Sequence, residues 1–311
     1  MPSKKTVDLL GLGIAPVDFF VSMDKHPSVG LKIDGIPGSS LVAGGGPVPT
    51  ACCTFSNFGG KAAVITSLGD DRWGQFAREE LESFGVDHSH CIIRKNCRSA
   101  LAFAWIEIGT GDRTIVLDMD KRLFIKPADI KLNSLPIPKL IHLDGRHVDA
   151  CAKLARWGQQ VGAKIMLDVG SIRNRVDALF PHIDYLICAD QFALHYWKTK
   201  SIEKAAQEFK KIGIPEVIVT SGIKGSYGID AEGNECFQRA YKIQAVDVTG
   251  AGDVYHGSHL YGLHQGWDIA RRMKFAAAAA ALKCTKPGAR MGIPTYRKAL
   301  TFMNRHRSFH A

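Results

Sequence analysis

The sequence predicts an α/β protein with a doubly wound, mostly parallel sheet flanked by helices and with a small antiparallel β lid. Short apolar runs alternate with helical patterns along the chain, and most of these runs end in Gly, Asp or Ser. Two further segments show strand-like alternation with no helix between them. The alternation of apolar runs with helical patterns, and the residues that end the runs, are typical of βαβ units with right-handed crossovers. We expect residues 1–311 to form a single domain.

The main sheet should be built from apolar runs that are long enough to be buried strands. These runs are residues 7–13, 61–69, 139–145, 163–170, 183–190 and 216–222. The stretches with helical spacing between them are residues 49–59, 74–85, 149–162 and 201–213. In open α/β sheets, ligands bind at the carboxyl ends of the strands, so functional residues are expected just after these runs.

The lid is predicted from two segments, about 32–44 and 98–118, that alternate apolar and polar residues. The sequence "GTGD" at 109–112 is a hairpin turn signal within the second segment. A small sheet of this kind above the ligand-binding edge would exclude water from a reaction.

Composition and charge narrow the class of protein. The chain has 311 residues, of which 46% are hydrophobic and 23% charged, as in an ordinary globular enzyme. The longest apolar candidate, 275–282, is too short to cross a membrane, and residues 1–13 lack the apolar core of a signal peptide. We therefore expect a cytoplasmic protein that does not bind a membrane. The eight cysteines include no Cys-x-x-Cys pair and are expected to be reduced and mostly buried.

The formal net charge of +10 is compatible with nucleic-acid binding or with an enzyme for anionic substrates. The basic residues are spread along the chain, and neither zinc-finger spacing nor an RNA-binding aromatic signature accompanies them. We therefore expect no nucleic-acid partner and favour attraction of a nucleotide or another anion.

Glycine spacing identifies the candidate phosphate-binding motifs of the chain. The chain has no Gly-x-x-x-x-Gly-Lys-Ser/Thr sequence, which excludes a Walker P-loop. Residues 11–16, "GLGIAP", match half of a dinucleotide fingerprint, but Pro16 replaces its third glycine, so NAD binding is not favoured.

The stretch "DVTGAGDVYHG", residues 247–257, places a glycine-rich turn before a helical pattern. Free backbone N–H groups and the helix dipole favour an anion at such a position, and glycines let a phosphate approach closely. Asp253 follows the turn directly. Its carboxylate is either a favourable charge in the first helical turn or the base for an attacking hydroxyl, and phosphoryl transfer needs both the base and the donors.

This stretch resembles the Asp-Thr-x-Gly-Ala-Gly-Asp signature of the PfkB-type, ribokinase-like carbohydrate kinases, with Val248 between Asp247 and Thr249. Residues 43–75, 217–228 and 276–294 resemble, in the same order, the family's Gly-Gly motif, its nucleotide-side strand and its adenine-flanking loop. In detail the motifs are most similar to a bacterial branch that includes sulfofructose kinase. The resemblance implies a ribokinase-like fold and transfer of a phosphoryl group from ATP to a hydroxymethyl group of a sugar or sugar derivative. Mg²⁺ would be carried mainly on the ATP phosphates.

The resemblance also implies the role of individual residues. Asp253 matches the catalytic base. The anion hole for the transferred phosphoryl group matches Gly250, Ala251 and Gly252. The nucleotide-binding positions match Thr220, Gly222 and Gly225. The sugar-binding positions match Asp18, Gly45 and Gly46.

The sequence departs from the family pattern at positions that bear on substrate and metal. Thr50 stands where the family has a sugar-binding Asn. Ala189 and Phe192 stand at the positions of its Asn-x-x-Glu segment, with Asp190 as a partial substitute. No protein metal site is therefore assigned.

Three basic residues are candidates for binding an anionic group. Arg146 follows an expected strand, where its guanidinium either binds a carboxylate, sulfonate or phosphate or is a solvated loop residue. Lys32 and Arg113, in and near the lid, either add positive charge to the site or lie on the surface.

Several functions remain open at this point. The favoured function is that of a sugar kinase, and the alternatives are a nucleoside kinase, a kinase of an anionic sugar, or a catalytically silent sugar or nucleotide sensor. The partners expected are a sugar-like small molecule and ATP. Because an open sheet edge invites pairing, we also expect a homodimer formed through the lid.

Overall fold

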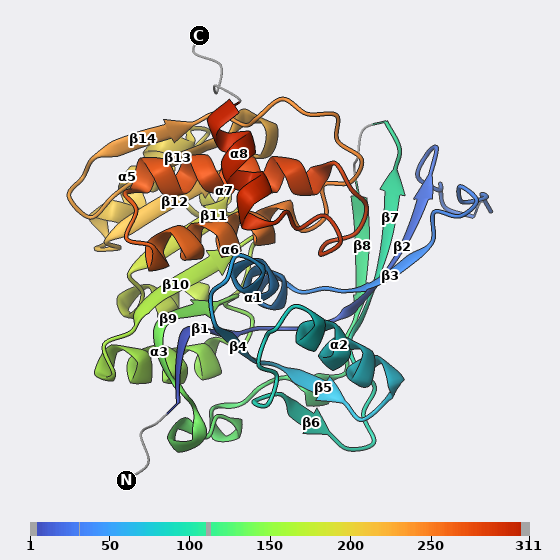
Figure 1. Ribbon diagram of the computed structural model, residues 1–311, viewed down its shortest axis with the longest axis horizontal. Coiled ribbons are helices and arrows are strands. Elements are labelled where there is room, and N and C mark those ends of the chain that lie inside the picture. Colours follow the sequence, from blue (N-terminus) through green and yellow to red (C-terminus); the bar gives the residue numbers. More distant parts are fainter. Residues whose placement is uncertain (1–4, 31, 110–112, 306–311) are drawn as a thin grey trace.

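The computed structural model describes residues 5–30, 32–109 and 113–305. Its centre is an eight-stranded sheet with strand order β14-β13-β12-β11-β10-β9-β1-β4 (Figure 1). The strands from β4 to β12 in this order are parallel, whereas β12, β13 and β14 pair antiparallel. The strands are β1 (Thr6–Leu12), β4 (Ala62–Ile65), β9 (Ile137–Leu143), β10 (Lys164–Val169), β11 (Tyr185–Ala189), β12 (Glu216–Thr220), β13 (Ser226–Ile229) and β14 (Glu235–Gln238).

Helices cover both faces of this sheet, which is why its central strands read as nearly continuous apolar runs. One face packs against α3 (Val148–Gln160), α4 (Asp190–Tyr196) and α5 (Ile202–Lys211). The other face packs against α1 (Pro47–Asn57), α6 (Ala251–His264), α7 (Ile269–Cys284) and α8 (Tyr296–Arg305). Short 3₁₀ segments lie at Lys121–Leu123, Pro127–Asp129, Leu132–Ser134, Val176–His182 and Gly222–Lys224. The predicted fold class is confirmed.

One predicted strand, 61–69, is divided in the structure. Its first part is β4, and the chain leaves the main sheet at Thr66, whose carbonyl accepts the Ile92 N–H at 2.8 Å. Its second part, β5 (Ser67–Gly69), pairs with β6 (Ile92–Arg94) in a separate two-stranded sheet beside α2 (Arg72–Ser83). A single apolar run thus serves two sheets, which its composition does not reveal.

The lid is a four-stranded sheet that projects from one side of the main sheet (Figure 1). Its order is β3 (Leu41–Gly44), β2 (Val17–Met23), β7 (Leu101–Glu107) and β8 (Arg113–Asp118). The two outer pairs are antiparallel and the β2–β7 pair is parallel. Strands β3, β7 and β8 lie inside the predicted segments, but β2 was not predicted, and residues 32–40 contain no strand. Of the predicted "GTGD" turn, Gly109 has a φ of 90°, whereas residues 110–112 lie outside the described chain.

Gly257 shows why α6 can lie close to α1. A Cβ at this position would collide with the Ala51 carbonyl oxygen of α1, so only glycine permits this approach. Six of the eight cysteines are buried, as expected. Within the residues described, none of the helices combines the length and apolar character that a bilayer crossing requires.

Candidate active site

The glycine-rich turn before α6 is held by the Asp247 carboxylate. This buried side chain accepts the Thr249 N–H at 2.8 Å with Oδ1 and the Gly288 N–H at 2.8 Å with Oδ2. Gly250, which caps α6, has a φ of 77°, and a Cβ there would lie 2.9 Å from Cα and Cβ of Ala289. The turn therefore requires glycine at this position, and Asp247 has a structural role.

The N–H groups of this turn are not all available to a ligand. The Ala251 N–H donates to the Val248 carbonyl at 3.1 Å. Across the described part of the chain, no hydrogen bond is recorded for the N–H groups of Gly250, Gly252 and Asp253. An added Cβ on Gly252 would have no atom within 4 Å, so open space lies beside it. Free donors, open space and the positive end of the α6 dipole are together suited to bind an anion.

Asp253 lies half-buried in the first turn of α6, next to these donors. Burial and the nearby Asp168 carboxylate raise the pKa of Asp253 to about 6, while the charges of His256, Arg113 and Arg290 oppose this rise. A carboxylate with a pKa near the working pH is suited to accept a proton from a hydroxyl group. Arg113 is exposed on lid strand β8, so a lid residue contributes charge to Asp253. Lys32 is exposed as well.

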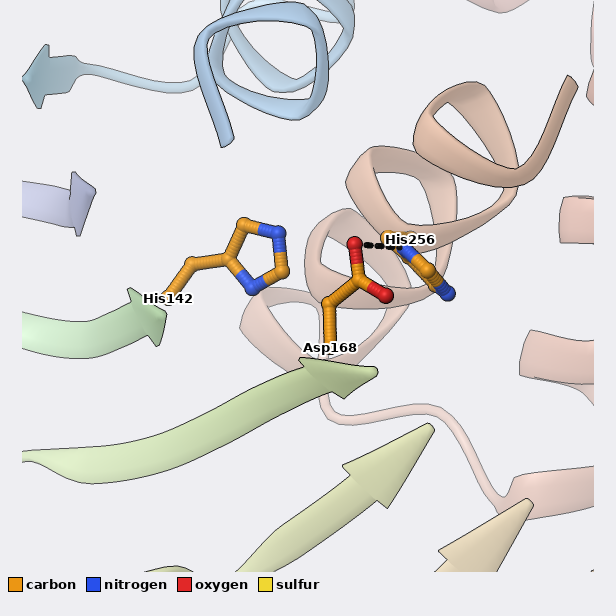
Figure 2. Close-up of side chains that lie close together, drawn as sticks. All are labelled: His142, Asp168 and His256. Carbon is orange, nitrogen blue, oxygen red and sulfur yellow. Dashed lines mark ion pairs between the residues drawn. The ribbon is translucent and has the colours of Figure 1, made fainter. Parts of the chain in front are cut away.

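Three buried polar side chains lie close together beneath this site: His142 on β9, Asp168 on β10 and His256 on α6 (Figure 2). His256 Nδ1 lies 3.1 Å from Asp168 Oδ2. Burial alone would lower the pKa of His256, but the Asp168 carboxylate raises it above its usual value. Burial lowers the pKa of His142 to about 4, so His142 is neutral.

The ligand atoms of these three residues lie within 4.8 Å of one another. However, Asp168 and His256 already neutralise each other as an ion pair. We therefore assign the trio to the electrostatic surroundings of Asp253, which lies in the first turn of the same helix, about one turn before His256.

Among the predicted sugar-binding residues, the backbone at Gly45 and Gly46 lies close to Asp18 and to Ile14. An added Cβ on Gly45 would collide with the Asp18 carboxylate, and one on Gly46, where φ is 92°, would collide with the Ile14 carbonyl oxygen. Burial raises the pKa of Asp18 to about 7; Arg290 opposes the rise, and Asp253 and Glu80 add to it. Asp18 therefore lies within electrostatic reach of the predicted base.

Arg290 connects these residues and was not predicted as part of the site. Arg290 is only 2% exposed, and its guanidinium donates to the Gly45 carbonyl at 2.6 Å, to Glu80 Oε2 at 2.8 Å and to Thr50 Oγ1 at 3.3 Å. Glu80 also accepts the Gly44 N–H. The hydroxyl of Thr50 is thus used to hold Arg290, and Thr50 itself is fully buried. The segment that resembles an adenine-flanking loop also contacts the predicted sugar-binding residues through Arg290.

Arg146 lies at the carboxyl end of β9 together with Arg173, which the sequence did not single out. The fully buried Asp144 organises this edge: its carboxylate accepts the N–H groups of Ile14 at 3.0 Å and Arg146 at 2.9 Å, and its carbonyl accepts from Arg173. Burial and the charge of Arg173 lower the pKa of Arg146. Within the described residues, Arg146 Nε is buried and has no hydrogen-bond partner. Two guanidinium groups thus lie near one carboxylate, whose recorded hydrogen bonds in the described residues come from backbone N–H groups.

The predicted nucleotide-binding residues form a tight turn after β12. Thr220 Oγ1 donates to the Cys188 carbonyl at 3.3 Å, and the Ser221 N–H donates to the Gly225 carbonyl at 2.8 Å. Gly222 and Gly225 have φ values of 51° and 105°, and a Cβ on Gly225 would collide with the Gln238 carbonyl oxygen. Open space beside Gly222 leaves room for a ligand.

The positions of the family's Asn-x-x-Glu segment offer no metal ligand. Ala189 has no polar side chain, and Phe192 is buried in the core. The Asp190 carboxylate accepts from the Ser221 hydroxyl and from the Gln191 N–H at 2.7 Å, so it supports the nucleotide-side turn.

The fold and this arrangement of residues are those expected of an α/β phosphotransferase. The family model described as pfkB family carbohydrate kinase matches residues 32–296. The chain belongs to this family and is a carbohydrate kinase.

Individual relatives span almost the whole chain. A ribokinase from Haemophilus influenzae is 25% identical and covers 96% of this chain and 99% of its own length. A 5-dehydro-2-deoxygluconokinase from Shouchella clausii is 22% identical over 94% of both chains. The structure of Arabidopsis thaliana ribokinase with ribose and ATP has a TM-score of 0.78 at 21% identity and covers 96% of this chain and 99% of its own. These relatives do not single out the branch that includes sulfofructose kinase, which stays a prediction.

Proposed function

We propose that the protein is an ATP-dependent kinase that phosphorylates a hydroxymethyl group of a sugar or sugar derivative. The observation that carries this proposal is the half-buried Asp253 carboxylate beside the free N–H groups of Gly250, Gly252 and Asp253. Phosphoryl transfer needs this combination of a base with donors for the charge of the moving group.

In this proposal the acceptor hydroxyl lies between Asp253 and the turn. Asp253 takes the hydroxyl proton as the oxygen forms a bond to the terminal phosphorus of ATP, and the bond from that phosphorus to the ADP oxygen breaks. The free N–H groups donate hydrogen bonds to the oxygens of the transferred group. Their direction is fixed before reaction because Asp247 and Gly250 hold the turn.

The nucleotide would bind along Thr220, Gly222 and Gly225, with Mg²⁺ arriving on its phosphates. Support comes from the positive φ values of the two glycines and the open space beside Gly222. The Arabidopsis ribokinase that shares this fold was solved with ribose and ATP.

The acceptor would bind Asp18 and the backbone at Gly45 and Gly46. Thr50 and Arg290 would support that backbone from behind, because Arg290 bonds to the Gly45 carbonyl and to Thr50. This assignment differs from direct contact of Thr50 with the sugar, which the resemblance implies.

A second candidate is a kinase of an anionic sugar, such as a sugar acid, sulfo-sugar or sugar phosphate. It is favoured by Arg146 and Arg173 at the edge of β9, where the two guanidinium groups outnumber the single Asp144 carboxylate. A guanidinium with an unused N–H is suited to bind a carboxylate, sulfonate or phosphate. A relative named for a gluconate derivative is compatible with this candidate.

A substrate panel distinguishes these possibilities. Neutral sugars, sugar acids, sulfo-sugars, sugar phosphates and nucleosides are compared by ADP release, with Arg146→Met and Arg173→Met tested on the best substrate. For an anionic substrate we expect each variant to raise KM by about tenfold or more, because a charge-assisted hydrogen bond contributes ~1.5–3 kcal/mol. Arg175→Met, whose guanidinium pairs with Asp149 on the surface, is the control. If MgATP binds tightly and no panel member releases ADP, the chain is a sensor and the proposed function is wrong.

We also propose that the lid forms a homodimer and that the protein is cytoplasmic. Val42, Phe19, Phe103 and Val116 are paired in register, one from each lid strand, and form an apolar row. Val42, Phe103 and Val116 are 38–49% exposed, so a second copy would cover them. Sedimentation velocity of the full chain tests this: a concentration-independent monomer contradicts it.

A further inference from the structure

Lys283 is a fully buried lysine in the last turn of α7. Burying an ammonium group is costly, so lysine is rarely buried completely unless it is paired. Lys283 Nζ donates to the Asp247 carbonyl oxygen at 2.7 Å. This is the one hydrogen bond recorded for the ammonium group within the described chain. Neither the fold nor the proposed reaction described above assigns a role to Lys283.

The acceptor of this hydrogen bond begins the anion-binding turn. The N–H groups of Val246 and Asp247 donate to the Cys284 carbonyl at 2.8 and 3.2 Å, so the end of α7 is attached to the chain just before the turn. Lys283 adds the third link from the same helix end. A cation is also favoured there by the α7 dipole.

The charges around Lys283 belong to the proposed reaction site. Burial lowers the pKa of Lys283, and the carboxylates of Asp247 and Asp253 oppose this change. Arg113 and Lys283 both act electrostatically on this region, but Arg113 is exposed whereas Lys283 is enclosed. A positive charge in an enclosed environment is screened little by water and acts over a longer distance than one on the surface.

We propose that Lys283 is a positioning residue for phosphoryl transfer: its buried ammonium group fixes the Asp247 carbonyl beneath the anion-binding turn and adds a positive charge behind the N–H donors of Gly250, Gly252 and Asp253. This inference rests on the proposed kinase function. The ammonium group supplies a cation from the chain itself, at a site where the donors proposed to contact the phosphoryl group are backbone N–H groups. The charge should favour the terminal phosphate of ATP over ADP, which lacks that group.

The first test separates this role from ordinary packing. Lys283→Met keeps an apolar stem of similar length and removes the charge. We expect kcat on the best panel substrate and the affinity for MgATP to fall by about tenfold or more, less than the loss from deleting a direct donor, which is ~10²–10³-fold. The affinity for MgADP should change less, so the ratio of ATP to ADP affinity, measured by calorimetry, should fall. Lys274→Met, on the same helix and partly exposed, should leave all three quantities unchanged.

The second test replaces the missing cation. In Lys283→Ala, the space left by the side chain admits a small cation. We expect ammonium chloride to restore turnover, whereas tetramethylammonium chloride at the same concentration should not, because its ion is too large. Where Lys283→Met fails to fold, Lys283→Gln takes its place, since the amide keeps a donor for the Asp247 carbonyl and carries no charge.

Two results would overturn the inference. One is an ATP-to-ADP affinity ratio and a kcat within twofold of wild type in folded Lys283→Met or Lys283→Gln. The other is an equal loss of both affinities together with a lower Tm and no ammonium rescue, which would make Lys283 purely structural. If the wild type phosphorylates no panel member, the proposed function fails separately, and the ATP-to-ADP affinity ratio still decides the role of Lys283.

Discussion

The turn at 247–253 and the Asp18–Arg290 region, which comprises Asp18, Gly45, Thr50, Glu80 and Arg290, differ in how they present charged and polar groups. In the turn, the groups that face the ligand are backbone N–H groups and one carboxylate, all within a short stretch of chain. In the Asp18–Arg290 region, charged side chains from the lid, from α2 and from the C-terminal segment meet in the interior. The part proposed to handle the phosphoryl group, which is the same in every reaction of this type, is local. The part proposed to bind the acceptor is assembled from distant segments.

The largest expected effect lies in the turn. Asp253→Asn removes the base but keeps the size of the side chain, so we expect kcat to fall by about 10²–10⁴-fold. MgATP affinity and Tm should stay close to wild type, because no hydrogen bond to the Asp253 carboxylate is recorded in the described chain. Steady-state ADP release and calorimetry measure the two quantities. Near-normal turnover in this variant would show that Asp253 is not the base and that the base lies outside the turn.

Arg290→Met tests the other region. It leaves Glu80 and the Gly45 carbonyl without their partner, and breaking a buried ion pair costs about 3–5 kcal/mol. We expect the free energy of unfolding in urea to fall by this amount and KM for the acceptor to rise, with little change in MgATP affinity. Arg297→Met, exposed on α8, is the matched control. An unchanged acceptor KM in folded Arg290→Met would remove Arg290 from the acceptor side.

Asp18→Asn should change the pH dependence of stability. Burial raises the pKa of Asp18 from 3.8 to about 7, so the folded protein holds a proton that the unfolded chain releases between these values. This group therefore stabilises the fold fully below about pH 4, and the contribution is lost as the pH rises through about 7. Asn cannot ionise, so above about pH 7 the variant should be more stable than wild type, by the order of 1 kcal/mol or more. Urea unfolding curves across this range measure it; parallel pH profiles for the two proteins would contradict the prediction.

The smallest effect concerns the trio beneath the turn. Activity that needs ionised Asp253 should rise with pH through about 6, the pKa of this group. His256→Gln removes a positive charge that lowers this pKa and leaves Asp168, which raises it, without its partner. We expect the rise in kcat/KM to move to higher pH by up to about one unit. His182→Gln should leave the profile in place, and a shift to lower pH would contradict the electrostatic role of the trio.

The same contrast explains how much the sequence could predict. The buried parallel strands were predictable because burial on both faces makes them continuous apolar runs. Asp253 and the glycines of the turn are neighbours in sequence, so their chemistry is visible in one motif. Arg290 was not predictable as a partner of the acceptor side, because its contacts with Glu80 and Gly45 join residues 210 and 245 positions apart.

The lid shows a related limit. Strand β2 follows β1 after a short connection, and its pairing with both β3 and β7 is set by register between segments far apart in the chain. The trio likewise unites side chains from β9, β10 and α6 (Figure 2). His256 lies in the motif at 247–257, but His142 and Asp168 belong to no motif, so the sequence does not show that the three meet.

Asp18 belongs to lid strand β2, whereas Asp253 belongs to α6. The residue expected to select the acceptor and the residue expected to activate it are therefore carried by separate pieces of backbone that can accumulate mutations independently. A few substitutions in the lid could redirect the protein to a new acceptor while its phosphoryl-transfer chemistry is inherited unchanged. Such a division gives a single fold an economical route to diverse specificities.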